Sequence, residues 1–238
     1  MGRIAKTVLV SALLLASVQP VDGQRRHRDA HRSGPGGVFG VSFVAADAVG
    51  DFGTVVDQGF GAQFTAGFPM AADGHLRLRA DLGFVVYGLE RLHYCGISCR
   101  VTSELTTTNN IVHVGIGPEV VFSSGPVQPY LFGTAGGSFF VTSSSLDDHD
   151  GYGPYLQTTN YSDGVYSLKY GGGLRMRVGG HHRPVFIDLG VERHDNGIVD
   201  YLTRGDIVDN PDGTVTLFPN RSDADLVTFR LGVAFRIH

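Results

Sequence analysis

The last thirteen residues, Leu226–His238, alternate almost throughout between apolar side chains and small or charged ones. The apolar members at every second position are Val227, Phe229, Leu231, Val233, Phe235 and Ile237. Because successive side chains of a strand point to opposite faces, this period of two predicts a β-strand with one apolar and one polar face. The apolar face of such a strand is covered either by a protein core or by lipid, and the rest of the chain decides between them.

The N-terminal residues have the pattern of a secretory signal peptide. Arg3 and Lys6 give a basic start, and the apolar run Val8–Val18 follows. This run is too short to cross a bilayer as a helix, which disfavours the alternative of a membrane-anchoring segment. We therefore expect a signal peptide over residues 1–23, cleaved after Gly23, and an exported protein.

A basic, glycine-rich segment, residues 24–37 (QRRHRDAHRSGPGG), comes next and offers almost nothing to bury. We expect it to be a flexible lead-in. Its arginines and histidines have the chemistry to bind acidic partners or a metal, but a solvated tether is the simpler interpretation. The remaining residues, 38–238, have the length of one domain.

The amino-acid composition is compatible with a membrane β-barrel, although the mean hydropathy of the chain is ordinary. After the leader, no apolar run is long enough for a transmembrane helix, and the mean hydropathy is only +0.03. Transmembrane strands are short and alternating, so an ordinary mean hydropathy is expected of them. The 34 glycines suit curved strands, and the 15 Phe and 9 Tyr suit aromatic girdles at the membrane interfaces. The net charge of -4 is too small to indicate a partner.

Eight segments alternate as the C-terminal one does. They are Val38–Ala45, Phe60–Phe68, His75–Leu89, Asn110–Phe122, Val127–Val141, Val165–Val178, Val185–Arg193 and Leu226–Ile237. The short connections are Pro69–Gly74, Ser123–Pro126 and Gly179–Pro184, and the long ones that alternate with them are Asp47–Gly59, Glu90–Asn109, Thr142–Gly164 and His194–Asp225. Short periplasmic turns and long outer loops are typical of outer-membrane barrels. The chain therefore predicts an all-β fold, an eight-stranded antiparallel up-and-down transmembrane β-barrel.

The two faces of these segments differ in charge. One face is apolar and almost free of charge, and the opposite face carries Arg77, Arg79, Asp81, Glu119, Lys169, Arg175, Arg177, Asp188, Glu192, Arg230 and Arg236. A charge facing lipid costs about 2–4 kcal/mol near the membrane midplane, whereas a lipocalin-like soluble barrel would have an apolar lumen. We therefore expect the charges to form an ion-pair network that fills the lumen. The segment Val127–Val141 is apolar on both faces, and its orientation stays unassigned.

The chain resembles the small outer-membrane β-barrel superfamily of the OmpA and OmpX type. The resemblance rests on the C-terminal FRLGVAFRI, on Pro129–Gly133 (PYLFG) and on GGGLRMR from Gly171, which indicate the fold and no particular subfamily. It implies a Gram-negative outer membrane, contact with outer-membrane lipid, and an insertion machinery that reads the C-terminal strand. Family members usually end on an aromatic residue, whereas here the last outward residue is Ile237, followed by His238.

The second long loop contains two cysteines, Cys95 and Cys99. In an exported protein this spacing favours a disulfide, which would stabilise the loop by about 2 kcal/mol or less because the ring is short. A metal site with His93 is the alternative. The flanking stretches Tyr87–Tyr94 and Val101–Asn109 are β-prone and predict either a hairpin that projects beyond the membrane or an ordinary mobile loop.

The acidic loops do not have the spacing of a known metal site. In the third long loop, Asp148 and Asp150 could belong to a D-x-D-x-D-G calcium pattern, but Leu146 occupies its first ligand position. In the fourth, Asp206, Asp209 and Asp212 also lack an EF-hand pattern. We expect solvated loops, no metal and no cofactor.

A stretch at the end of the seventh segment invites a catalytic interpretation. His194-Asp195-Asn196 faintly resembles the His-x-Ser-Asn stretch of outer-membrane lipid A deacylases, but it lacks the nucleophilic serine. We therefore expect no catalytic residue and no enzyme activity.

Three functions follow from these patterns. The leading hypothesis is a barrel with a charge-filled lumen that presents its extracellular loops for envelope integrity, adhesion or binding of an extracellular partner, with no role for nucleic acid. The second is a narrow or gated ion pore in which Lys169, Glu192 and Arg230 form the gate. The third is an outer-membrane lipid-modifying enzyme.

Overall fold

The computed structural model describes residues 36–95, 102–148, 154–179, 184–210, 212 and 214–237. The predicted signal peptide, most of the predicted lead-in, Cys99 and His238 lie outside these ranges, so the expectations for them stay predictions.

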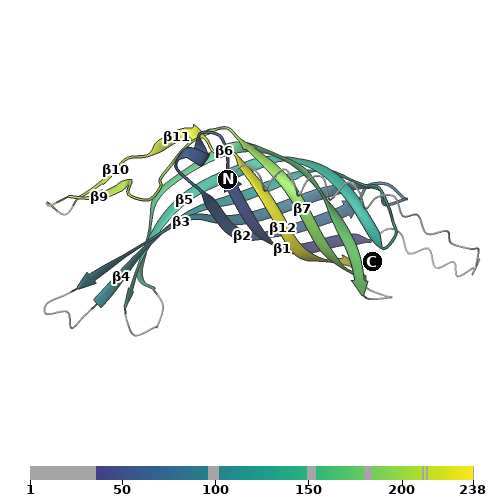
Figure 1. Ribbon diagram of the computed structural model, residues 1–238, viewed down its shortest axis with the longest axis horizontal. Coiled ribbons are helices and arrows are strands. Elements are labelled where there is room, and N and C mark those ends of the chain that lie inside the picture. The colour runs from purple at the N-terminus through teal and green to yellow at the C-terminus, as the bar shows by residue number, and fades with distance from the viewer. Residues whose placement is uncertain are drawn as a thin grey trace, which may run out of the picture. The chain divides into compact units, whose positions relative to one another are not determined.

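Eight long strands close into one antiparallel ring (Figure 1). They are β1 (Gly37–Ala48), β2 (Gln58–Pro69), β3 (Leu76–Cys95), β4 (Thr102–Val121), β5 (Val127–Asp148), β6 (Pro154–Gly179), β7 (Val185–Asn196) and β12 (Leu226–Ile237). Each strand pairs with its neighbour in the chain, except that β7 pairs with β12 and β12 closes the ring on β1. The predicted eight-stranded transmembrane barrel is confirmed. Among the described residues, no helix has both the length and the apolar character to span a membrane.

The first and last strands pair along their full length. Gly37 lies opposite Ile237 at one end of this ladder, and Ala48 lies opposite Leu226 at the other. Closure therefore leaves neither strand with an unpaired edge inside the ring, as a membrane-spanning sheet requires.

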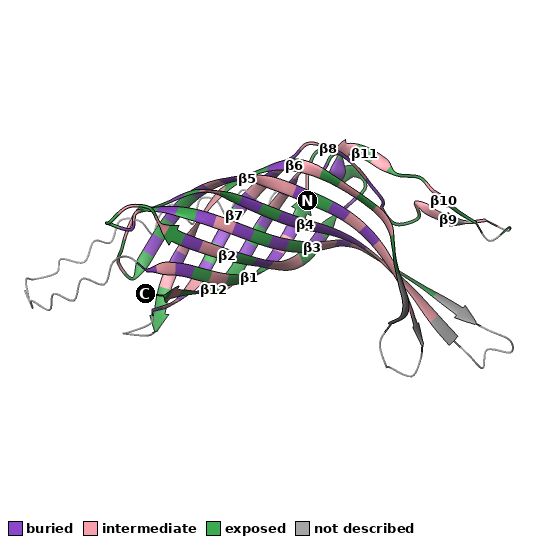
Figure 2. Cartoon of the chain, turned by 180° about the vertical axis from the view of Figure 1, so that it is seen from behind, coloured by how far each residue is buried: buried purple, intermediate pink, exposed green. Residues whose placement is uncertain are grey.

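The alternation of the sequence becomes an alternation of exposure (Figure 2). On β12, Phe229 and Leu231 are 51% and 57% exposed, while the neighbouring Thr228 and Arg230 are 0% and 3% exposed. Large apolar side chains dominate the exposed face along the middle of the barrel strands, and the charged pair Arg193 and Asp195 lies on that face only at the loop end of β7. The exterior is therefore a lipid-facing surface, and the buried charges lie in the lumen.

The structure also orients β5, which the sequence left unassigned. Leu131 and Phe139 face outward, whereas Tyr130, Phe132 and Phe140 are buried in the interior. The strand is apolar on both faces because its inward aromatic rings lie against guanidinium groups. The alternation of apolar and polar residues therefore could not indicate which face of β5 points inward.

Two hairpins extend beyond the predicted strand ends. The β3–β4 ladder continues to the pair Cys95–Thr102, and the β5–β6 ladder continues to Asp147–Pro154. The first outcome favours the projecting hairpin over the mobile loop. The second corrects the prediction that Thr142–Gly164 is a long loop, because most of this stretch is strand. Its Ser- and Thr-rich sequence is polar on both faces, which hides the alternation that would have revealed it.

The fourth long connection is also structured rather than an open loop. It contains two short antiparallel pairs, β8 (Ile198–Tyr201) with β11 (Asn220–Asp223) and β9 (Ile207–Asp209) with β10 (Val215–Leu217). Acidic side chains hold its turns: Asp206 accepts hydrogen bonds from the backbone N–H and the hydroxyl of Thr203, at 2.7 and 2.8 Å. Local bonds of this kind fix the turn at Asp206.

An apolar cluster fills the loop end of the barrel. The first long connection forms a short 3₁₀ helix, η1 (Phe52–Thr54), and Phe52 is fully buried. Its ring lies edge-on to Tyr87, Tyr201 and Phe140, with centroid distances of 5.4, 4.9 and 6.2 Å. This set of four rings, hereafter the outer cap, packs over the charged part of the lumen.

Candidate functional site

The charged lumen is organised in two connected tiers. In the outer tier, Lys169 Nζ lies 3.2 Å from Asp81 Oδ2 and 3.7 Å from Glu192 Oε1. Glu192 Oε2 also pairs with Arg230 Nε at 2.9 Å. These four residues come from β6, β3, β7 and β12, so the tier spans the lumen from one side of the barrel to the other.

The inner tier, nearer the short turns, is centred on Glu119. Arg175 donates to both of its oxygens at 2.7 Å, in the bidentate geometry that makes arginine–carboxylate pairs strong. Arg79 Nη1 donates to Glu119 Oε2 at 3.0 Å, and Arg77 Nη1 lies 3.7 Å from Oε1. Three guanidinium groups therefore surround one carboxylate.

Arg79 connects the two tiers. Besides Glu119, it donates from Nε to Asp81 Oδ1 at 2.9 Å. Its guanidinium stacks 3.8 Å from the ring centroid of Phe132, and Arg175 stacks 4.1 Å from that of Tyr130. The inward aromatic residues of β5 therefore act as platforms for the cations.

Tyr130 adds hydrogen bonds to this stacking. Its hydroxyl donates to Asp188 Oδ1 at 2.6 Å and accepts from Arg230 Nη2 at 2.9 Å. Sequence reasoning missed Tyr130 and Phe132 as lumen residues. The one signal that pointed to them was a strand with apolar residues on both faces.

Nine of the eleven charged residues assigned to the lumen from sequence take part in these ion pairs: Arg77, Arg79, Asp81, Glu119, Lys169, Arg175, Asp188, Glu192 and Arg230. Each of the nine is at most 3% exposed. The other two lie at the turn end: Arg177 is exposed, and the guanidinium of Arg236 donates a long 3.5 Å bond to Gln128 Oε1. Within the described residues, no ion pair includes either of these two arginines.

A polar layer with two histidines lies between the ion pairs and the outer cap. The rings of His113 and His194 are 5.1 Å apart, and His194 Nε2 lies 3.2 Å from Glu192 Oε1. Ser138 donates to Asn196 Oδ1 at 2.8 Å and lies 3.4 Å from His113 Nδ1. All four of these side chains are at most 5% exposed.

The side chains of the His194-Asp195-Asn196 stretch, considered above for catalysis, lie on two different faces of β7. His194 and Asn196 point into the lumen, whereas Asp195 points outward and pairs with Arg193. Two hydroxyls do lie beside histidines: that of Thr228 is 3.3 Å from His194 Nε2, and that of Ser138 is 3.4 Å from His113 Nδ1. Sequence reasoning missed Ser138. Periodicity could not place it, because β5 had no assigned orientation.

The outer cap is held by polar contacts as well as by packing. The Tyr87 hydroxyl donates to the Leu202 carbonyl at 3.0 Å, and the Tyr201 and Ser222 hydroxyls are 2.9 Å apart. Tyr201 belongs to the outer connection, and burial raises the pKa of its hydroxyl above the ordinary value. The cap therefore fixes the fourth connection over the mouth of the barrel.

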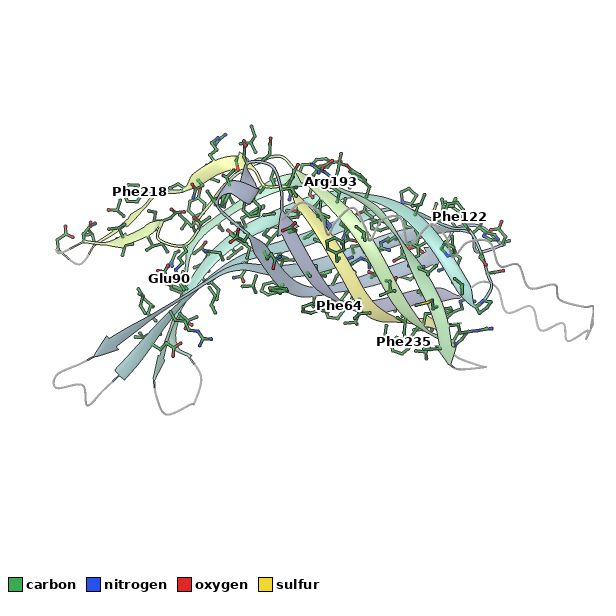
Figure 3. The ribbon with its side chains drawn as sticks, viewed as in Figure 1. Phe64, Glu90, Phe122, Arg193, Phe218 and Phe235 are labelled. Carbon is green, nitrogen blue, oxygen red and sulfur yellow. The ribbon has the colours of Figure 1, made fainter. Side chains whose placement is uncertain are left out.

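A groove of about 330 Å³ lies between the projecting sheet and the β9–β10 hairpin (Figure 3, where Glu90 labels the sheet side and Phe218 directly follows β10). Its lining consists of Glu90, Leu92, Leu105, Thr107, Ser144, Asn160, Ile207, Val215 and Leu217. The Thr107 and Ser144 hydroxyls are 2.8 Å apart, and Asn160 Nδ2 donates to Ser144 Oγ at 2.6 Å. The groove thus has apolar walls and a hydrogen-bonded polar strip.

Among the residues that the structure describes, no group of three or more His, Cys, Asp or Glu side chains is arranged to hold a metal ion. The structure describes only the backbone of His93 and Cys95, and Cys99 lies outside the described ranges, so the disulfide and the alternative metal site stay predictions.

A closed eight-stranded ring with an apolar exterior and a charged lumen defines an outer-membrane β-barrel, and the protein lies in the outer membrane. No protein-family model matches the chain, and no curated protein does. In fold it resembles solved outer-membrane proteins, among them the following three. Ail, the attachment invasion locus protein of Yersinia pestis, is 15% identical, with 86% of this chain and 99% of that one covered and a TM-score of 0.44.

The second is Neisserial surface protein A, which is 16% identical, with 84% of this chain and 96% of that one covered and a TM-score of 0.40. The third is a major outer membrane protein from Thermus thermophilus, which is 14% identical, with 84% of this chain and 99% of that one covered and a TM-score of 0.42. The likeness concerns the barrel fold, and the ring closure of this chain itself carries the assignment.

Proposed function

We propose that the protein is a closed, non-enzymatic outer-membrane barrel that presents the groove between its projecting sheet and the β9–β10 hairpin to an extracellular partner. The observation that supports this proposal best is the groove itself. Its walls include Leu92, Leu105, Ile207, Val215 and Leu217, apolar side chains on the long-loop side of the barrel. Apolar surface outside both membrane and core is typical of binding sites.

The packing of the outer cap supports a role in presentation rather than transport. Phe52 and Leu202 are fully buried over the lumen, and Ala224 is equally buried at the base of the fourth connection. These contacts hold the outer connections in a fixed arrangement. Preorganised elements lose less conformational entropy when they bind, so a fixed groove favours a specific partner.

The groove suits an apolar side chain that ends in a hydrogen-bonding group. The leucine and valine walls would cover the apolar part, and Thr107, Ser144 and Asn160 line the polar strip. Adhesion to a host or to a neighbouring cell, through a protein segment of this chemistry, is the role that we favour.

The test compares adhesion of cells that carry groove variants in a deletion strain. Val215→Glu places a charge on the groove wall, and Val208→Glu places one on the opposite face of the same hairpin; the two valines are 54% and 42% exposed. We expect wild type and Val208→Glu to adhere to cultured epithelial cells, and Val215→Glu to lose most of that adhesion at equal surface abundance. Equal adhesion of both variants, or no adhesion above the deletion strain, would contradict the proposal.

A narrow gated pore is the second candidate, and one observation favours it. Among the described residues, Lys169 Nζ and Arg230 Nε and Nη1 make no hydrogen bond of good geometry, and the Lys169–Glu192 contact is long at 3.7 Å. A loosely bonded gate of this kind would open when one partner is removed. In planar bilayers, Glu192→Ala or Arg230→Ala would then raise the conductance, whereas a closed barrel predicts none from wild type or from either variant.

We also propose that the protein is not an enzyme, although a serine lies beside a histidine. Ser138 is fully buried between the ion pairs and the outer cap, where a lipid substrate would have to displace Phe52. Loss of a lipid A modification in the deletion strain that wild type restores and His194→Ala does not would overturn this.

A further inference from the structure

The turn end of the barrel has more cationic groups than its carboxylates can pair. Both oxygens of Glu119 accept from Arg175, and Oε2 also accepts from Arg79. Arg77 is left at 3.7 Å from this carboxylate, and its buried Nη1 has no hydrogen-bond partner in the part of the chain that the structure describes. Leaving a buried guanidinium donor unsatisfied is costly, so this group indicates that something else completes its surroundings.

A second arginine lies in the same place with a weak partner. Arg236, on β12, is half-buried and donates to Gln128 Oε1 at 3.5 Å, beyond the usual range for an N–H···O bond. Its backbone N–H donates to the Pro184 carbonyl at 3.1 Å, which fixes this end of the strand. The position of Arg236 is therefore set by the barrel, while its guanidinium makes only the long bond to Gln128 and a 5.6 Å contact with the Phe186 ring among the described residues.

The two arginines line one small cavity. Its volume is about 50 Å³, and its lining includes His75, Arg77, Ser123, Ser124 and Arg236. A water molecule occupies about 30 Å³ in the liquid, so the cavity has room for one small polyatomic group. The Nδ1 of His75 lies 2.6 Å from the Val121 carbonyl, which directs the ring.

The cavity also contains one carboxylate, that of Asp73. Its Oδ1 accepts from the backbone N–H of His75 at 3.0 Å, so it helps to hold the turn. Arg77 is held in a similar way, because its Nε donates to the Gly74 carbonyl at 3.2 Å. The Nη1 of Arg77 makes none of these bonds.

We propose that this cavity binds a phosphate group between Arg77 and Arg236, with the serine hydroxyls as further donors. Two guanidinium groups from separate strands, β3 and β12, line this cavity, and two separate cations suit a tetrahedral oxyanion better than a planar carboxylate that one fork satisfies. The group would come either from free phosphate in the periplasm or from the headgroup of an inner-leaflet phospholipid, since both lie at the short-turn end of an outer-membrane barrel. This site is independent of the outer groove.

The first experiment titrates inorganic phosphate into the whole protein, refolded in a maltoside detergent without phosphate. We expect saturable binding by calorimetry, while acetate at equal ionic strength gives none. Arg236→Gln is expected to weaken binding about tenfold, and Arg236→Lys to weaken it less, because the charge remains but the fork is lost. Arg177→Gln is the matched control, an exposed arginine of the same barrel end that does not line the cavity, and it should bind as wild type does.

The second experiment distinguishes the two sources. The same titration is repeated in nanodiscs of phosphatidylethanolamine and phosphatidylglycerol. If the headgroup occupies the site, the bilayer abolishes phosphate binding, and native mass spectrometry finds more retained phospholipid on wild type than on Arg236→Gln. If free phosphate is the ligand, binding persists in the nanodisc. No phosphate binding in detergent, or equal binding by wild type and Arg236→Gln, would overturn the proposal.

Discussion

Lys169 on β6 reaches across the barrel to Asp81 on β3, with Nζ 3.2 Å from Oδ2. These strands are separated in the ring by β4 and β5, so the ion pair joins two walls that share no backbone hydrogen bond. Each member also has a second partner: Glu192 for Lys169 and Arg79 for Asp81. The lumen is therefore a connected lattice of charges that braces the barrel from inside.

Replacing Asp81 with alanine should destabilise the whole barrel. The substitution leaves Lys169 and Arg79 buried with less compensation, and breaking a buried pair in this way costs about 3–5 kcal/mol. The temperature at which the folded band is lost on heating, followed by gel mobility, should fall. Asp223→Ala, at an exposed position of the outer connection, is the control and should change it little. An unchanged midpoint for Asp81→Ala would contradict the bracing role.

Phe52→Ala should loosen the outer cap. Removing a fully buried phenyl ring costs about 3–5 kcal/mol, and the loss falls on the outer connections because the ring packs against Tyr201 and Tyr87. We expect faster trypsin cleavage at the exposed Arg204 and Arg221 while the folded gel band persists. Val55→Ala, next to the same 3₁₀ helix and 47% exposed, should be cleaved as wild type is. Equal cleavage of all three proteins would show that Phe52 does not hold the cap.

A charge on the outer face of the last strand should impair membrane folding. Leu231 is 57% exposed on β12, and an arginine facing lipid there costs about 2–4 kcal/mol if it lies near the midplane. The folded fraction after refolding into vesicles should drop for Leu231→Arg. Phe218→Arg, equally exposed but in the outer connection, should refold normally. Normal refolding of Leu231→Arg together with impaired refolding of Phe218→Arg would contradict the placement of Leu231 against lipid.

The outer cap should weaken at high pH. Burial raises the pKa of Tyr201 in the folded protein, so its neutral hydroxyl stabilises the fold below the unfolded value of about 10. That contribution is lost as the pH rises through the higher folded value. Trypsin cleavage of the outer connections should therefore accelerate above about pH 10 in wild type and less steeply in Tyr201→Phe. The exposed Tyr166→Phe is the control, and a pH profile of Tyr201→Phe identical to wild type would refute the assignment.

Cys95 and Cys99 should be joined in the exported protein. Intact mass after maleimide treatment should show no label without reductant and two labels after reduction. Labelling of both thiols without reductant would contradict the disulfide and leave the metal alternative with His93 open.

The strands and their faces could be predicted from the sequence because lipid imposes a strict rule on one side of each strand. The rule fails where the other side is also apolar, as at Tyr130 and Phe132, since their contact with Arg79 and Arg175 is a property of the closed barrel. Which charges share a strand end could be anticipated from an up-and-down order. The Lys169–Asp81 pair could not, because it depends on the distance across the lumen.

The outer elements were less predictable for a different reason. The sequence around Phe52 does not indicate that this side chain is buried, because its burial depends on Tyr201 of β8, far along the chain. The groove likewise forms because the fourth connection folds into paired strands. These contacts join residues far apart in the chain, and local patterns carry no information about them. The cavity at Arg77 and Arg236 likewise needs β3 and β12 placed on one rim.

The pairing of β1 with β12 makes closure of the ring depend on both ends of the barrel domain. Gly37 lies opposite Ile237, so the ring closes only when the first and the last barrel strands are both in place. Until then two unsatisfied strand edges would face the bilayer, where no water is available to them. A chain that ends before β12, through premature termination of translation or through proteolysis, would thus form an open sheet whose unpaired strand edges are unfavourable in the hydrocarbon region.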